Sequence, residues 1–119
     1  MIECVVGVIV WTEDMQRLLG FYRDVLCLKL HSQSENFAAF KFGEIRLSLG
    51  KHQQVKGRSQ DSYRIMINLG TAGIHQEYQR LLSQGVEFIR KPVQEHWGGW
   101  VATCFDPDGN VLQLLQQPS

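Results

Sequence analysis

The hydrophobic and polar positions divide the chain into two halves with the same order of elements. In the first half, the β-branched residues 2–11 predict a buried strand. Apolar residues then recur at helical spacing, which predicts a helix with Thr12 as its N-cap. Three short strands joined by turns complete this half, over residues 28–34, 37–42 and 45–49.

The second half repeats this order after a polar segment without periodicity, residues 51–61, which predicts a linker. Alternation over residues 63–69 predicts a strand. A helix is expected from Thr71 or Ala72 to Gln84, and Gly85 is a typical C-terminal stop. The last elements are a strand over residues 86–90 and a closing β-hairpin whose turn is Asp106-Pro107-Asp108-Gly109-Asn110.

Each half therefore predicts strand, helix and three strands, a βαβββ module. We expect one α+β domain over residues 1–119, with modules at about residues 2–50 and 62–117. One module alone would leave one face of its sheet uncovered. Two tandem modules packed together predict a curved mixed sheet around a cleft, with the helices outside.

Composition excludes several classes of protein. Hydrophobic residues make up 44% of the 119 positions and charged residues 20%, as in ordinary soluble domains. The net charge is zero and there is no basic run, so nucleic acid is not an expected partner. No apolar run predicts a membrane span or a signal peptide. The three cysteines are too scattered for a disulfide framework, and we expect reduced thiols in the cytoplasm.

Several motifs resemble the vicinal-oxygen-chelate superfamily, which includes glyoxalase I, extradiol dioxygenases, fosfomycin-resistance enzymes and bleomycin-resistance proteins. Residues 21–26, Phe-Tyr-Arg-Asp-Val-Leu, are similar to a family motif in which Cys27 replaces a glycine. Residues 81–86 and the hairpin from Trp97-Gly98-Gly99-Trp100 to Leu115 also match. The resemblance covers nearly the whole chain and implies the tandem βαβββ fold.

The resemblance also implies where metal-using members hold their metal. These positions fall on the first and last strand of each half, at Val5 or Gly7, Ser48 or Gly50, Ser62 or Arg64, and Gln113. None supplies the imidazole or carboxylate that zinc, nickel or iron prefers, and Arg64 would add a positive charge. We therefore expect no metal ion and no cofactor in the usual position of the superfamily.

The histidines and cysteines do not predict another catalytic centre. His31, His52, His75 and His96 are dispersed and match no metal-binding spacing. His52 and His75 are expected on the surface, whereas His96 adjoins Trp97 at the mouth of the predicted cleft and is a candidate ligand contact. Cys4 and Cys104 are expected as inert thiols in strands, and Cys27 ends a helix, where the helix dipole does not activate a thiol.

What remains is a cleft able to bind a small molecule. Trp11, Trp97 and Trp100 are candidate aromatic walls, while Phe37, Phe40 and Phe42 are more typical of packing. The alignment turns Arg64 and Gln113 inward. Arg64 then binds an acidic ligand or pairs with an internal carboxylate from Glu3, Glu44 or Asp61. The predicted ligand-binding residues are Arg64, Gln113, Trp97, Trp100, His96, Ser48 and Trp11.

Our first hypothesis is a metal-free member of the superfamily that binds or sequesters a small organic molecule. Its architecture would be similar to that of the bleomycin-resistance proteins, and the resemblance implies a homodimer. The second hypothesis is a glyoxalase-type lyase, isomerase or dioxygenase with an atypical metal site. A third is a metal-independent enzyme that uses Arg64 to stabilise charge and His96 as an acid or base.

Overall fold

The structure is a computed structural model that describes all residues, 1–119. The chain consists of two compact units, Met1–Gly57 and Arg58–Ser119, which we call module 1 and module 2. The boundary between them lies inside the predicted linker, residues 51–61. Neither module has a helix with the length and apolar character needed to cross a membrane.

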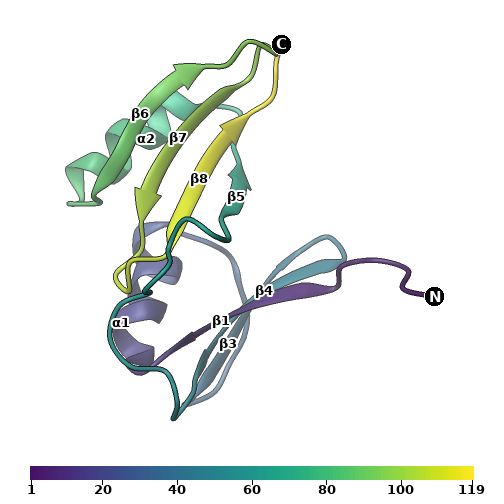
Figure 1. Ribbon diagram of the computed structural model, residues 1–119, viewed down its shortest axis with the longest axis vertical. Helices are drawn as coiled ribbons and strands as arrows, with labels where there is room; N and C mark the ends of the chain where they lie inside the picture. Colours follow the sequence, from purple (N-terminus) through teal and green to yellow (C-terminus); the bar gives the residue numbers. More distant parts are fainter. The chain divides into compact units, whose positions relative to one another are not determined.

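Module 1 contains a four-stranded mixed sheet in the order β1-β4-β3-β2 (Figure 1). Strands β1 and β4 are parallel, and the other neighbours are antiparallel. The helical segment continues from an α-helix into a π-helical turn. In chain order the elements are β1 (Gly7–Thr12), α1 (Met15–Leu19), η1 (Gly20–Val25), β2 (Leu30–Gln33), β3 (Phe37–Phe42) and β4 (Ile45–Lys51).

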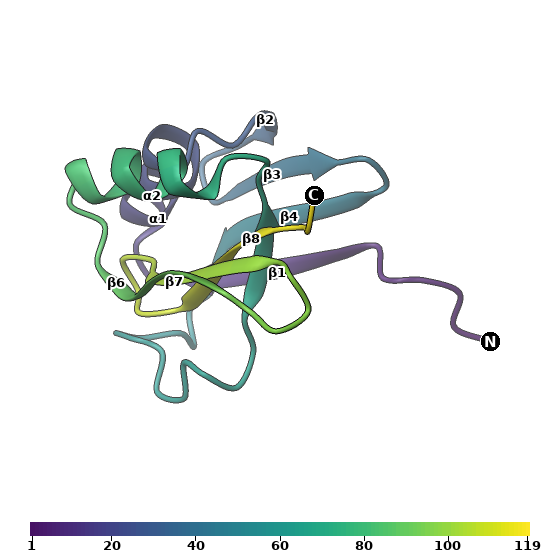
Figure 2. The ribbon, with the colours of Figure 1, turned by 90° about the horizontal axis from the view of Figure 1, so that it is seen from above.

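Module 2 repeats this topology, with strand order β5-β8-β7-β6 and a parallel pair β5–β8. Helix α2 lies against one face of this sheet (Figures 1 and 2). The elements are β5 (Ile67–Gly70), α2 (Ile74–Ser83), β6 (Phe88–Gln94), β7 (Trp100–Phe105) and β8 (Val111–Gln116). The predicted α+β class, with two tandem βαβββ modules, is confirmed.

The predicted first strand is too long. Residues 2–11 form a β-branched run, but β1 begins only at Gly7, opposite Arg46 of β4. The backbone N–H of Arg46 donates to the carbonyl of Val6, and no strand pairing precedes this bond. The preceding residues extend beyond the sheet (Figure 1) and are exposed. The backbone N–H and C=O groups of a strand must pair with a neighbouring strand, and residues 2–5 have no such neighbour. Their β-branched side chains alone are not enough to form a strand.

The predicted N-cap is also shifted. Asp14, and not Thr12, caps α1: its carboxylate accepts a hydrogen bond from the backbone N–H of Arg17 at 3.1 Å. The hydroxyl of Thr12 instead accepts from the backbone N–H of Asp14 at 3.0 Å. Thr12 is fully buried and therefore fixes the turn between β1 and α1 rather than the helix itself.

The core of each module lies between its helix and its sheet. In module 1 the largest fully buried side chains come from the helical segment and from β3 and β4: Leu18, Tyr22, Phe40 and Leu49. In module 2 they come from α2, β7 and β8: Ile74, Leu81, Cys104 and Leu112. The opposite face of each sheet carries a different set of side chains, which we call the helix-free face.

Candidate functional site

The two faces of the module 2 sheet are distinguished by contacts with α2. Trp100 stacks on His75 of α2 with ring centroids 4.7 Å apart, and Phe88 stacks on Tyr78 at the same distance. The side-chain oxygen of Gln116 accepts a hydrogen bond from the backbone N–H of Ile74 at 2.8 Å. Because side chains alternate along a strand, the intervening residues of β7 and β8 occupy the helix-free face.

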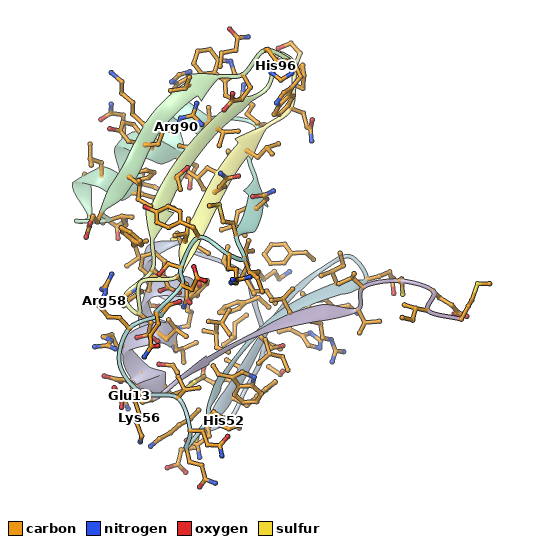
Figure 3. The ribbon with its side chains drawn as sticks, viewed as in Figure 1. Glu13, His52, Lys56, Arg58, Arg90 and His96 are labelled. Atoms are coloured by element: carbon orange, nitrogen blue, oxygen red, sulfur yellow. The ribbon has the colours of Figure 1, made fainter.

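A row of four polar residues crosses this helix-free face. Asn68 of β5 pairs with Gln113 of β8, Gln113 pairs with Thr103 of β7, and Thr103 pairs with Arg90 of β6. Paired residues on neighbouring strands have Cβ atoms about 5 Å apart, within reach of one ligand. Arg90 forms an ion pair with Glu95 at 2.8 Å (Figure 3). The row therefore offers amide, hydroxyl and guanidinium groups side by side.

Apolar residues flank the polar row on both sides. Val101 pairs with Leu115, and Val93 of β6 pairs with Val101. On the other side Phe105 pairs with Val111. This pattern, a few hydrogen-bonding groups set among apolar side chains, is typical of sites that bind small organic molecules.

The turn between β7 and β8 is held by its own first residue. Asp106 is buried, and its Oδ1 accepts hydrogen bonds from the backbone N–H groups of Asp108 and Asn110, both at 2.9 Å. Its Oδ2 accepts from the side-chain amide of Asn110 at 2.8 Å. The guanidinium of Arg58 lies 5.7 Å above the Phe105 ring. These contacts fix the ends of the strands that carry Thr103 and Gln113.

The helix-free face of module 1 is identified in the same way. Arg23 of the helical segment donates a hydrogen bond to Gln33, which pairs with Ala38 of β3, which in turn pairs with Leu49 of β4. Leu49 therefore faces the helix, and its neighbour Ser48 lies on the helix-free face. Ser48 pairs with Ile9 of β1 and Ala39 of β3.

An aromatic cluster lies one row from Ser48. Trp11 and Phe37 flank Gly50, and their ring centroids are 6.4 Å apart. The His52 ring meets Trp11 edge-on with a centroid separation of 5.3 Å. A Cβ atom on Gly50 would lie 2.5 Å from the Trp11 ring, so only glycine leaves this space to the indole. Trp11 is still 40% exposed and offers a surface on which a flat ligand can stack.

Three of the predicted ligand-binding residues lie on helix-free faces, one in module 2 and two in module 1. Gln113 lies on the helix-free face of module 2, and Ser48 and Trp11 lie on that of module 1. Trp100 points the other way, onto α2, because Ala102 and Cys104 on the same face of β7 are packed in the core. As a result, Trp100 and Gln113 occupy opposite faces of one sheet.

Arg64, Trp97 and His96 lie outside the strands. Arg64 precedes β5, is exposed, and forms an ion pair with Asp61 at 2.7 Å. Arg64 therefore does not turn inward as the alignment implied, and its partner Asp61 is one of the three carboxylates considered from the sequence. His96 (Figure 3) lies exposed in the turn between β6 and β7, and Trp97 follows it in the same turn and is also exposed. The Trp97 ring folds over Gly99, where any side chain would collide with it.

Comparison with known proteins identifies the fold as a recurrent one. Residues 5–114 match the model of the Glyoxalase/Bleomycin resistance protein/Dioxygenase superfamily. The chain belongs to this superfamily. No curated protein sequence matches it.

Solved structures similar to this superfamily member share its fold at low sequence identity. A protein of unknown function from Agrobacterium tumefaciens str. C58 is 22% identical, with 98% of this chain and 96% of that chain covered and a TM-score of 0.80. A superfamily member from Sphaerobacter thermophilus DSM 20745 is 22% identical, with 98% of each chain covered and a TM-score of 0.76. A lactoylglutathione lyase from Agrobacterium tumefaciens is 17% identical, with coverage of 95% and 92% and a TM-score of 0.74.

The residues present do not fit the metal of this superfamily. Opposite Gln113 the structure places Asn68, and not Ser62 or Arg64; opposite Ser48 it places Ile9, and not Val5 or Gly7. Amide and hydroxyl oxygens are weak ligands for zinc, nickel or iron, and isoleucine has no atom that can bind a metal ion. No three His, Cys, Asp or Glu residues gather into a group that could hold a metal ion.

Asn68 is the residue that sequence reasoning missed. It is the one polar residue in the apolar run over residues 65–69, a signal that was available from the sequence. Because a strand was expected over residues 63–69, the site position was assigned near its start, at Ser62 or Arg64. The strand β5 occupies only Ile67–Gly70. Asn68 is therefore central in the real strand.

Proposed function

We propose that this superfamily member binds small organic molecules on the helix-free face of each module, without using a metal ion. The observation that carries the proposal is the side-chain set at the centre of the helix-free face of module 2. Asn68, Gln113 and Thr103 can donate and accept hydrogen bonds but cannot replace the imidazoles and carboxylates of a metal centre. Recognition by hydrogen bonds and stacking is what these residues support.

The aromatic cluster of module 1 supports the same proposal. A ligand ring that stacks on Trp11 gains contact area, and an aromatic pair adds about 0.5–1.5 kcal/mol beyond the area it buries. Gly50 keeps the backbone beneath the indole free of side-chain atoms. We expect ligands with a planar group and at least one hydrogen-bonding group.

The test is a fluorescence titration with a panel of small aromatic compounds, followed by chromatography of each compound after incubation. We expect saturable changes in emission that Trp11→Leu removes and Trp97→Phe leaves, and we expect the compound to be recovered unchanged. Gln113→Leu should weaken binding. Chemical conversion of the compound would refute a role confined to binding.

Metal analysis of the purified protein provides the complementary test. We expect no near-stoichiometric zinc, nickel, iron or manganese, and no saturable binding when each ion is added. A tightly held metal ion, together with activity lost to a chelator, would contradict the proposal and restore the glyoxalase-type or dioxygenase hypothesis.

We further propose that the protein forms a homodimer. The side chains of Ile2, Val5 and Val6 are 94%, 67% and 72% exposed, and they lead into the edge strand β1. An exposed apolar edge of this kind favours pairing with a second copy. Sedimentation analysis should give a dimer that Val6→Asp weakens, whereas Gln53→Asp, an exposed site in the segment after β4, should not.

We place the protein in the cytoplasm because its three cysteines, Cys4, Cys27 and Cys104, form no disulfide. Fractionation of the producing cell with detection of the tagged protein tests this placement, and recovery from a secreted or membrane fraction would contradict it.

A further inference from the structure

A cationic depression lies at the outer edge of the module 1 sheet. It has a volume of about 270 Å³ and is lined by Lys29, Leu30, His31, Lys41 and Gly43. The residues come from the start of β2, the end of β3 and the turn that follows. Two lysines and one histidine therefore line one small volume in a protein whose net charge is zero.

The cationic side chains have no acidic partner within the chain. Lys29, His31 and Lys41 form no ion pair, unlike Arg17, Arg23 and Arg64, which are neutralised by neighbouring aspartates. Lys41 also pairs across β3 and β4 with Arg46, a second cation without an ion pair. Like charges directly opposite each other destabilise a sheet. An anion bound in the depression, beside Lys41, would offset part of this repulsion.

The backbone of β2 is shaped around the same depression. Leu30 pairs with Phe40 and Ser32 with Ala39, so His31 is an extra residue without a partner on β3. Such a β-bulge redirects a side chain and interrupts the ladder of an edge strand. The bulged His31 lines the depression together with the two lysines, and Gly43, with φ of 60°, provides the tight turn beside them.

We propose that this depression binds the phosphate group of a small phosphorylated molecule. A phosphate ester carries close to two negative charges at neutral pH, which match the two lysines. Lysine acts as a point charge, and the lining lacks the planar arginine fork that favours carboxylates. The volume exceeds that of a single phosphate and leaves room for the group that carries it.

This site is separate from the aromatic cluster and does not depend on the proposed function. Phe37 begins β3 and Lys41 lies near its end, four residues further on. That separation is about 13 Å along a strand. Loss of one site therefore leaves the other to be tested by itself.

The experiment is an NMR titration of the ¹⁵N-labelled full chain with sodium pyrophosphate, with sodium malonate as a dicarboxylate comparison and ionic strength held constant with sodium chloride. We expect saturable shifts confined to residues 29–31 and 41–46, and weaker binding of malonate. The double variant Lys29→Ala, Lys41→Ala should lose about tenfold or more in affinity. The matched control Lys56→Ala, Lys91→Ala removes two exposed lysines elsewhere and should bind as the parent does.

Three results would overturn the proposal. Equal binding of malonate would make carboxylates the ligand class. Shifts spread over every lysine-bearing segment would show general screening of charge. Unchanged affinity in the Lys29→Ala, Lys41→Ala variant would leave these lysines with the protective role that lysine has on edge strands. Because both side chains are exposed, the variant should retain the parent's circular dichroism spectrum, which separates loss of binding from loss of fold.

Discussion

Replacing Gly50 with alanine is expected to displace the aromatic cluster of module 1. The new Cβ would lie 2.5 Å from the Trp11 ring and 3.2 Å from the Phe37 ring. Ordinary contact begins at 3.4 Å, so the indole must retreat from 2.5 Å to that distance, by about 0.9 Å. Trp11 is 40% exposed and can make this movement outward, but it then loses its edge contacts with Phe37 and His52.

The size of the effect follows from two opposing contributions. Two lost aromatic contacts cost about 0.5–1.5 kcal/mol each. Replacing glycine by alanine within a strand returns roughly 0.5–1 kcal/mol, because the unfolded chain has less freedom to lose. We therefore expect Gly50→Ala to lower the free energy of unfolding by about 1 kcal/mol. A deeply buried clash would cost more, and the exposure of Trp11 is what limits the effect.

Urea unfolding measures the stability, and the near-ultraviolet circular dichroism of the Trp11 environment measures the displacement. Trp11→Phe identifies the part of the spectrum that Trp11 contributes. Gly20→Ala is the matched control, because Gly20 has helical backbone angles and no atom within 4 Å of its Cβ position. It should gain about 0.4–1 kcal/mol. If Gly50→Ala were as stable as Gly20→Ala with an unchanged spectrum, Trp11 would not lie over Gly50.

Three further predictions concern stability and reactivity. Asp106→Ala should lower the free energy of unfolding by roughly 2–4 kcal/mol in urea, because three donors lose their acceptor, and Asp106→Asn should lose less. Hydrogen bonding to Arg80 lowers the pKa of Glu77 despite partial burial. The ionised Glu77 therefore stabilises the folded protein above the pKa that this carboxylate has in the unfolded chain, and this stabilisation is lost as the pH falls. Glu77→Gln should make the Tm decline less steeply in acid. Burial, with a smaller effect of Asp106, raises the pKa of Cys104 to about 12, so at pH 8 a thiol reagent should modify two cysteines in the native protein and the third only after unfolding.

Elements bounded on both sides by turn residues could be predicted from the sequence. The strand β3 occupies Phe37–Phe42 as expected, bounded by the turns at Glu35-Asn36 and Gly43-Glu44. Elements whose limits depend on a distant partner could not. β6 was expected over residues 86–90 but runs over Phe88–Gln94, because its pairing with β7 continues past two irregularities in register.

The candidate site was harder to predict because several strands are apolar at nearly every position. In β7, Trp-Val-Ala-Thr-Cys-Phe, alternation does not indicate which residues face the helix. Packing decides it: Ala102 and Cys104 are fully buried, and Trp100 shares their face. Gln113 was placed correctly on the family's last strand, whereas Arg64 was assigned to a strand that begins three residues later.

The polar row of module 2 also makes the superfamily's chemistry easy to alter by mutation. Asn68, Gln113 and Thr103 stand on adjacent strands, on the face opposite the packed core. Histidine at positions 68 and 103 and glutamate at position 113 would supply three side chains of the kinds that bind a transition metal, although the buried position 103 would have to make room for the ring. A metal site and a metal-free binding surface would thus differ by three side chains on the same backbone.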